Sequence, residues 1–258
     1  MKHILVCVKA VPVSSSVEVD GQHRLKRDGA NLQWNIADES ALEAAFRLID
    51  EDGCVTVLTM GPPKLEDPLK ELLARGAKRA LLITDRLMAG ADTRATAVAL
   101  AKAVALLQPV DLILCGCKAI DGETGQVPGE LAAALGVPCI SNAEKIEKTD
   151  AGLLISRRLE DGVQQLRLSG CGVVSFSSYA YPLRLAGIMG MRRARKIPVE
   201  LCSAADLGLD AVQCGLKGSL TKVVAMESRF PGLRRGPKTQ DVEQGIIAIS
   251  QMLGEVRQ

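Results

Sequence analysis

The chain has 258 residues, of which 47% are hydrophobic and 24% are charged, so it is long and apolar enough for one large folded domain. A net charge of +2 and an aromatic content of 2% argue against nucleic-acid binding, which uses a strongly basic surface or stacking aromatic rings. The two histidines and the eight cysteines, none in a Cys-x-x-Cys pair, argue against a metal site and against histidine-based catalysis. No apolar run resembles a signal peptide or reaches the roughly 20 residues of a membrane helix, so we expect a soluble, cytoplasmic protein without membrane insertion.

Strand and helix patterns alternate through the first half of the chain. Apolar runs predict strands at residues 4–9, 54–59, 79–84, 110–115 and 137–140. Apolar residues at helical spacing predict helices at residues 39–50, 65–74, 93–107 and 126–135. Asp38 is suited to cap the first helix, and Gly76 and Gly136 follow the second and fourth. This alternation predicts an α/β fold, a doubly wound and mostly parallel sheet with helices on both faces.

The pattern changes after about residue 143. We expect a β-hairpin, a buried strand, a basic segment and a final helix, at residues 151–168, 172–177, 188–196 and 242–253. The part beyond the basic segment has too little periodic core to fold as a separate domain. We therefore predict an α/β domain at residues 1–197, with the hairpin as an insertion, and a C-terminal arm at residues 198–258 that packs on a partner subunit.

The segment between the strand at 110–115 and the helix at 126–135 is the best candidate for a ligand site. It reads Cys117-Lys118-Ala119-Ile120-Asp121-Gly122-Glu123-Thr124-Gly125-Gln126-Val127. Gly122 and Gly125 allow a tight backbone, and the amides after them can point at a phosphate, which the positive end of a helix stabilises. A tight loop with Thr124 as an N-cap explains the same residues equally well, because neither a Walker lysine nor a GxGxxG is present.

Three other segments stand at strand ends or before a helix. Lys9 can neutralise phosphate charge, and Gly61 allows a close backbone approach. The polar residues before Asp38 can contact an adenine edge, with Trp34 as a shield. Each segment alone is more often an ordinary loop. The predicted fold brings all of them to one edge of the sheet, which favours the nucleotide-site hypothesis.

The sequence contains no constellation for catalysis by side chains alone. There is no GxSxG, no histidine in a catalytic context and no cysteine beside a base. We therefore expect no independent substrate chemistry, and a redox cofactor would supply any reactivity.

The order and spacing of several motifs resemble the electron transfer flavoprotein β subunits, over nearly the whole chain. These motifs are Ile4-Leu5-Val6-Cys7-Val8-Lys9, Asn35 with the helix entered at Asp38, Gly61-Pro62, Ala119-Ile120-Asp121-Gly122, the hairpin from Ile155 to Leu166, and Ile188-Met189 before a basic run. The resemblance implies an α subunit that carries FAD, a second nucleotide on this subunit, and a C-terminal arm that embraces the partner.

The resemblance also assigns residues by position. It places nucleotide contacts at Cys7, Lys9, Asn35, Ala37, Asp38, Met60, Cys117, Asp121, Gly122, Glu123, Thr124, Gly125, Gln126 and Val127. It places docking on an acyl-CoA or other flavin dehydrogenase at Leu185, Ile188 and Met189, with Leu185 as the apolar anchor.

The nucleotide is expected to be FAD, with AMP as the second choice. The stretch from Asp121 to Val127 is closer to the Asp-Gly-Asp-Thr-Ala-Gln-Val of FAD-binding, electron-bifurcating members, which oxidise NADH, than to the loop of AMP-binding carriers. Two other functions are weighed against this one. A stand-alone adenine-nucleotide-binding regulatory module would not need the long arm, and a nicotinamide-dependent dehydrogenase would carry GxGxxG after the first strand.

Overall fold

The structure is a computed structural model that describes residues 1–13, 32–224 and 241–255. The described strands are β1 (His3–Cys7), β2 (Ala10–Pro12), β3 (Leu32–Trp34), β4 (Cys54–Met60), β5 (Arg79–Ile83), β6 (Leu112–Gly116), β7 (Cys139–Thr149), β8 (Gly152–Leu159), β9 (Gly162–Leu168), β10 (Val173–Phe176) and β11 (Glu200–Cys202). The described helices are α1 (Ile36–Leu48), α2 (Glu66–Arg75), α3 (Thr93–Leu106), α4 (Val127–Leu135), α5 (Ile188–Ala194), α6 (Gly215–Gly218) and α7 (Val242–Glu255), with the 3-10 turns η1 (Pro63–Leu65) and η2 (Arg86–Met88).

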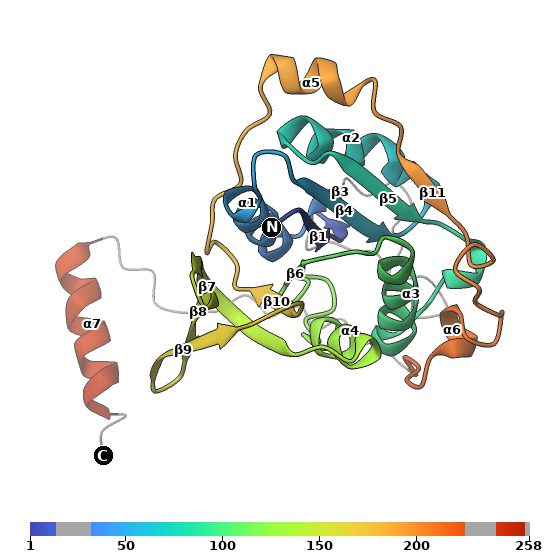
Figure 1. Ribbon diagram of the computed structural model, residues 1–258. Coiled ribbons are helices and arrows are strands. Elements are labelled where there is room, and N and C mark those ends of the chain that lie inside the picture. Colours follow the sequence, from blue (N-terminus) through green and yellow to red (C-terminus); the bar gives the residue numbers. More distant parts are fainter. Residues whose placement is uncertain (14–31, 225–240, 256–258) are drawn as a thin grey trace. The chain divides into compact units, whose positions relative to one another are not determined.

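The central sheet is large and mostly parallel (Figure 1). Its nine described strands have the order β11-β5-β4-β1-β6-β10-β7-β8-β9, and β2 and β3 form a separate antiparallel pair. The chain runs from β1 through β4 to β5 on one side, and α3 then carries it to β6 on the other side of β1. The predicted doubly wound α/β fold is confirmed, and the strand order reverses between β1 and β6.

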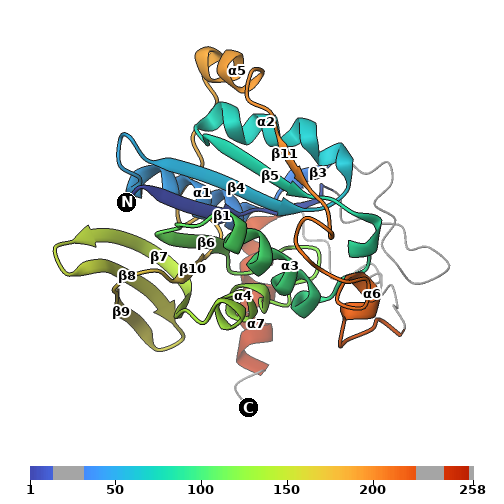
Figure 2. The same cartoon turned by 45° about the vertical axis from the view of Figure 1, so that its right-hand side comes forward.

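Alternate side chains of the central strands enter two separate cores. Val6 of β1 packs in the core formed by α1 and α2, whereas its neighbours Leu5 and Cys7 pack in the core formed by α3 and α4. Figure 2 shows these helix pairs on opposite faces of the sheet. Because both faces are covered, the carboxyl ends of the strands become the place where a ligand can reach the sheet.

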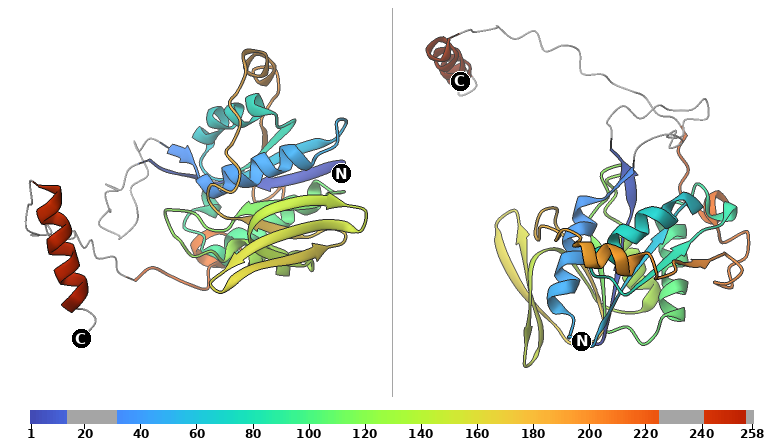
Figure 3. Two further views of the ribbon diagram at one scale, coloured as in Figure 1. Left: turned by 90° about the vertical axis from the view of Figure 1, so that its left-hand side faces the viewer. Right: turned by 90° about the horizontal axis from the view of Figure 1, so that it is seen from above.

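The antiparallel part of the sheet is longer than predicted. The strand expected at residues 137–140 extends as β7 to Thr149, and β8 and β9 follow it in antiparallel register (Figure 3). The expected hairpin is therefore present, and it continues the main sheet through β7. Ile140, Ala143 and Ile146 are the buried residues of β7, and their spacing of three departs from a regular alternation because the register shifts near Ala143.

The chain divides into two compact units, Met1–Val223 and Val224–Gln258. The first unit thus extends beyond the boundary expected at residue 197. β11 pairs with β5, and Leu207 and Leu209 are buried in the core beside α3. The side chains of Leu207 and Leu209 complete that core, so the first unit continues beyond residue 197. The second unit contains α7, and its packing on a partner stays a prediction. No helix in the described part is long and apolar enough to cross a membrane.

Candidate functional site

A buried carboxylate joins the two strands between which the strand order reverses. Asp38, in the first turn of α1, is 6% exposed. Its Oδ2 accepts a hydrogen bond from the amide of Lys9, just after β1, at 2.7 Å. Its Oδ1 accepts one from the amide of Gly116, the last residue of β6, at 2.9 Å. One side chain therefore holds the ends of β1 and β6 against the start of α1.

The environment of this carboxylate changes its acidity. Burial raises the pKa of Asp38 to about 7, and hydrogen bonds from Asn35 and from the amides of Lys9 and Gly116 limit the rise. Asp38 consequently changes its charge near neutral pH. A perturbed pKa of a buried carboxylate beside strand ends is typical of functional sites.

Gly116 is needed for the close approach of α1 to β6. A Cβ at this position would lie 2.2 Å from Oδ1 of Asp38 and 2.8 Å from the Cβ of Ala37. Both distances are shorter than real Cβ contacts, so any larger residue must displace α1. Gly116 was not among the predicted site residues, and its place at the end of a buried strand was the only signal for it.

Asn35 presents an unused acceptor at the same edge. It is 1% exposed, and its backbone N–H donates to the carbonyl of Lys9 at 2.9 Å. Its side-chain Nδ2 donates to the carbonyl of Lys118, also at 2.9 Å. The Oδ1 atom is buried and has no hydrogen-bond partner among the described residues. A buried acceptor without a donor costs about 1–3 kcal/mol, so this position suits a donor from a ligand.

The two carboxylates of the loop after β6 are both held by lysines. Nζ of Lys9 contacts Oδ1 of Asp121 at 2.7 Å, and the Asp121 side chain is 4% exposed. Nζ of Lys118 contacts Oε1 of Glu123 at 3.1 Å. These pairs offset the negative charge of the loop, which would otherwise repel a phosphate. The first pair also connects the loop to the end of β1.

The turn before α4 leaves a group of amides unused. Glu123 and Gly125 have φ angles of 50° and 64°, in the left-handed region, and so form a tight exposed turn. The backbone amides of residues 124–127 donate no hydrogen bond to another described residue. These donors stand at the positive end of α4, where an anion is stabilised.

The other predicted contact residues lie at the same edge. Cys7 ends β1, Met60 ends β4 and Cys117 follows β6, while Ala37 is buried in the first turn of α1. Trp34, expected as a shield for an adenine, is instead buried in the core with α1 and α2. The structure thus brings together the carboxyl ends of three strands, the start of α1 and the turn before α4.

Thr93 is a second residue of this edge, after Gly116, that was not predicted. Oγ1 of Thr93, at the start of α3, donates to Oε1 of Gln126 at 3.0 Å and to Oε1 of Glu130 at 3.1 Å. Asp92 caps α3 by accepting from the amide of Ala95 at 2.9 Å. The Asp92-Thr93 pair before a predicted helix was a recognisable cap and would have placed α3 at this edge.

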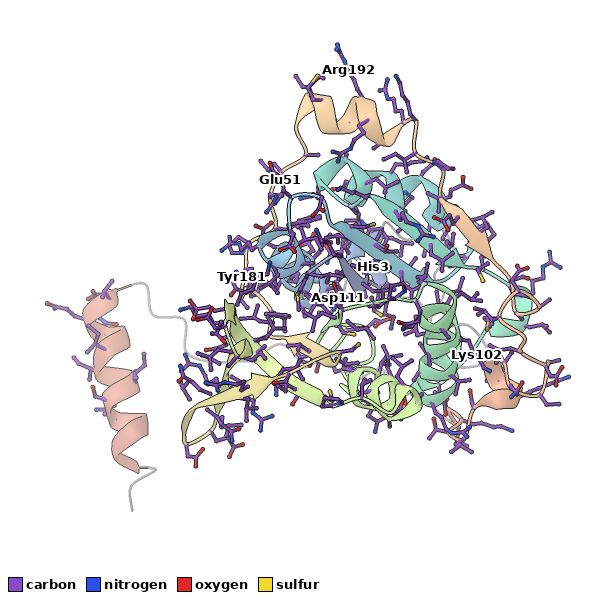
Figure 4. All side chains as sticks on the ribbon, viewed as in Figure 1. His3, Glu51, Lys102, Asp111, Tyr181 and Arg192 are labelled. Atoms are coloured by element: carbon purple, nitrogen blue, oxygen red, sulfur yellow. The ribbon has the colours of Figure 1, made fainter. Side chains whose placement is uncertain are left out.

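The residues expected to dock on a dehydrogenase lie elsewhere, on the outer side of α2 (Figure 1). Leu185, Ile188 and Met189 are 86%, 68% and 74% exposed. Arg192 of the same segment points away from the molecule (Figure 4). A group of exposed apolar side chains of this kind is typical of a contact surface for another protein.

The fold and the site define a doubly wound α/β protein with open polar groups at the reversal of strand order, the usual ligand position of such sheets. A family model described as the electron transfer flavoprotein domain matches residues 23–207. The chain is 40% identical to the electron transfer flavoprotein subunit beta of Thermoanaerobacterium thermosaccharolyticum, over 86% of each chain.

Two further relatives have similar coverage. The caffeyl-CoA reductase-Etf complex subunit CarD of Acetobacterium woodii is 36% identical over 85% of each chain. Protein FixA of Azorhizobium caulinodans is 39% identical over 86% of this chain and 82% of the relative. The chain therefore belongs to the electron transfer flavoprotein family, among its β subunits, as the resemblance in sequence predicted.

Proposed function

We propose that this β subunit binds a nucleotide at the carboxyl edge of its sheet and transfers electrons together with an α subunit. The observation that supports the site is the set of unused polar groups at this edge. The amides of residues 124–127 suit phosphate oxygens, and Oδ1 of Asn35 suits an N–H donor such as an adenine amino group. Membership of the family favours this role over a stand-alone regulatory module.

The nucleotide we propose is FAD, with AMP as the alternative. No atom lies within 4 Å of the position that a Cβ on Gly122 would take, so this part of the loop leaves room for a pyrophosphate. Bound FAD would supply the capacity to accept a hydride from NADH and to divide its two electrons between two routes. The chain's own groups would bind and orient it, with Lys9 and the turn amides toward the phosphates.

Quantification of cofactors in the purified α–β heterodimer tests this proposal. Two FAD per heterodimer support it, and one FAD with one AMP would reject FAD in favour of the alternative. A heterodimer with a single FAD and no second nucleotide would contradict the proposal that this subunit binds a nucleotide. Denatured extracts measured by chromatography against FAD and AMP standards distinguish the three results.

We also propose that the second unit packs on the α subunit. Val242, Ile246 and Ile249 recur at helical spacing on α7 and are exposed within this unit. Such an apolar face should cause self-association when no partner covers it. Co-expression with the α subunit, followed by size-exclusion chromatography, should yield a heterodimer. A soluble monomer that does not bind the α subunit would contradict this assignment.

The partner that exchanges electrons with the heterodimer is proposed to be an acyl-CoA dehydrogenase or another flavin dehydrogenase, docked at Leu185. Leu185→Ala should raise the KM for the dehydrogenase and leave the nucleotide content unchanged. The family membership and the exposure of Leu185 support this proposal. The expected cytoplasmic location stays a prediction.

A further inference from the structure

The exposed apolar segment at residues 185–191 is fixed to the body of the protein by a buried charge on a different element. Glu43 of α1 is 4% exposed, and its carboxylate faces the residue that directly precedes the segment. Oε2 of Glu43 accepts from Nε of Arg184 at 2.9 Å, and Oε1 accepts from Nη2 of Arg184 at 3.0 Å. The backbone amide of Arg184 donates to Oε2 at 3.2 Å as well. Three hydrogen bonds thus converge on one carboxylate.

The surroundings of this pair make it rigid. Nε of Arg47 donates to Oε1 of Glu43 at 3.0 Å, so two guanidinium groups share the carboxylate. The guanidinium of Arg184 lies 4.7 Å from the centre of the Phe46 ring, and that of Arg47 lies 4.8 Å from the centre of the Tyr181 ring. Burial by itself raises the pKa of Glu43, but the hydrogen bonds from Arg184 and Arg47 outweigh it and hold the pKa below the usual value. The carboxylate is therefore charged at neutral pH.

A second set of contacts holds the same segment on α2. Nη1 of Arg75 donates to the carbonyl of Arg184 at 2.7 Å, and Nη2 of Arg193 donates to the carbonyl of Leu73 at 3.0 Å. A Cβ on Gly190 would lie 2.1 Å from the carbonyl oxygen of Ala74, so α5 lies directly against the end of α2. Leu185 and the apolar residues after it are thus presented from a segment anchored at both ends.

We infer that Glu43 is a positioning residue for the docking of a flavin dehydrogenase, because it fixes Arg184 and thereby the place of the apolar segment beside it. This inference rests on the proposed docking at Leu185. Glu43 itself is buried and does not reach the partner. Its effect is to order the segment before the partner arrives, which reduces the entropy lost on binding.

The test uses the α–β heterodimer with bound cofactors and two variants. Glu43→Gln keeps the shape of the side chain and removes its charge, and Arg184→Lys keeps a positive charge and removes the two-pronged contact. Arg79 and Glu200 provide a matched control, because they form a similar contact at 2.9 and 2.8 Å between β5 and β11. Glu200→Gln should leave the segment and docking unchanged.

Two measurements follow the segment and its function. Hydrogen–deuterium exchange at residues 185–191 should be roughly tenfold faster in Glu43→Gln and Arg184→Lys, as expected for a loosened segment. The KM for an acyl-CoA dehydrogenase of the same organism, reduced with its own acyl-CoA substrate, should rise about fivefold while kcat stays within about twofold. Nucleotide content is measured as a control, because α1 also carries Asp38. It should match that of the unaltered protein, since Asp38 and not Glu43 contacts the ends of β1 and β6.

A double-variant cycle separates this inference from the proposed docking. If Leu185 acts through the position that Glu43 imposes, combining Glu43→Gln with Leu185→Ala should raise the KM by less than the product of the two single effects. If Leu185→Ala alone leaves the KM unchanged, the docking proposal is overturned, and this inference with it. If Leu185→Ala raises the KM while neither Glu43→Gln nor Arg184→Lys does, docking stands and the positioning role of Glu43 is rejected.

Discussion

The two edges of the central sheet differ in how completely their polar groups are paired. At the amino edge, the ring of His3 lies between the carbonyl of Pro109 and Oγ1 of Thr56, both at 2.8 Å. The carboxylate of Asp111 accepts from the amides of Lys2 and His3. Figure 4 shows His3 and Asp111 together at this edge. These polar groups of the amino edge are therefore paired with one another.

The carboxyl edge keeps open positions. Among the described residues, three of the four buried side-chain atoms without a partner belong to Asn35, Thr59 and Glu130, which stand at strand ends or helix starts of this edge. Native proteins rarely leave buried polar atoms unpaired, so their concentration at one edge indicates a place for a ligand. The difference between the two edges supports the proposal that the carboxyl edge binds a ligand.

Gly116→Ala should have the largest effect, because it acts on the geometry of the open edge. The new Cβ would lie 2.2 Å from Oδ1 of Asp38 and must displace α1. We expect a loss of about 2–5 kcal/mol in the free energy of unfolding, from overpacking and broken buried hydrogen bonds, together with loss of bound nucleotide. Urea denaturation and cofactor quantification measure both. Gly129→Ala in α4 is the matched control, since nothing lies within 4 Å of its Cβ position.

Asp38→Asn should reveal a dependence on pH that belongs to the open edge. The pKa of Asp38 is about 7 in the folded protein and has an ordinary value of 3.8. Between pH 3.8 and about 7 the folded state therefore binds one proton more than the unfolded state. The free energy of unfolding of the unaltered protein should therefore fall relative to Asp38→Asn as the pH rises from 4 to 7. The change is on the order of 4 kcal/mol. A difference between the two proteins that does not vary over this range would show that the carboxylate is ionised throughout.

Thr124→Pro should weaken nucleotide binding by about one to a few kcal/mol, because it removes one amide of the turn and strains it. The preceding residue, Glu123, has a φ of 50°, and proline restricts the conformation of the residue before it. The loop is exposed, so the free energy of unfolding without nucleotide should change little. Thr124→Ala keeps the amide and is the matched control. Unchanged nucleotide content in Thr124→Pro would place the phosphates elsewhere.

The regular parts of the fold could be predicted because they depend on periodic patterns in the sequence. The strands and helices up to Leu135 leave a pattern of apolar residues in the sequence because their side chains enter a core. In β1, for example, Val6 and Leu5 enter opposite cores. The extension of β7 to Thr149 could not be predicted in this way, because its outward residues are charged and its register depends on β8. β11 was also missed, since three residues carry too short a pattern.

The candidate site was predictable in its elements and not in its contacts. Strand ends and helix starts follow from the pattern, so Lys9 and Asp121 could be assigned to one edge. That these two form an ion pair depends on the path of the loop in three dimensions. The roles of Gly116 and Glu43 were hidden for the same reason, because each depends on a close contact with a residue far along the chain.

Asp50→Asn should have the smallest effect and the opposite dependence on pH from Asp38→Asn. Asp50 follows α1 at the amino edge, where hydrogen bonds from Lys148 and from the amino group of Met1 lower its pKa to about 2. A lowered pKa contributes stability that is present above about pH 4 and is lost as the pH falls toward 2. The gap between the unaltered protein and Asp50→Asn should thus close over that range, in urea midpoints measured at each pH. Because these charges are partly exposed to water, 1 M salt should reduce the gap at pH 6. A gap that is equal at pH 2 and pH 6 would show that packing, and not charge, holds this edge together.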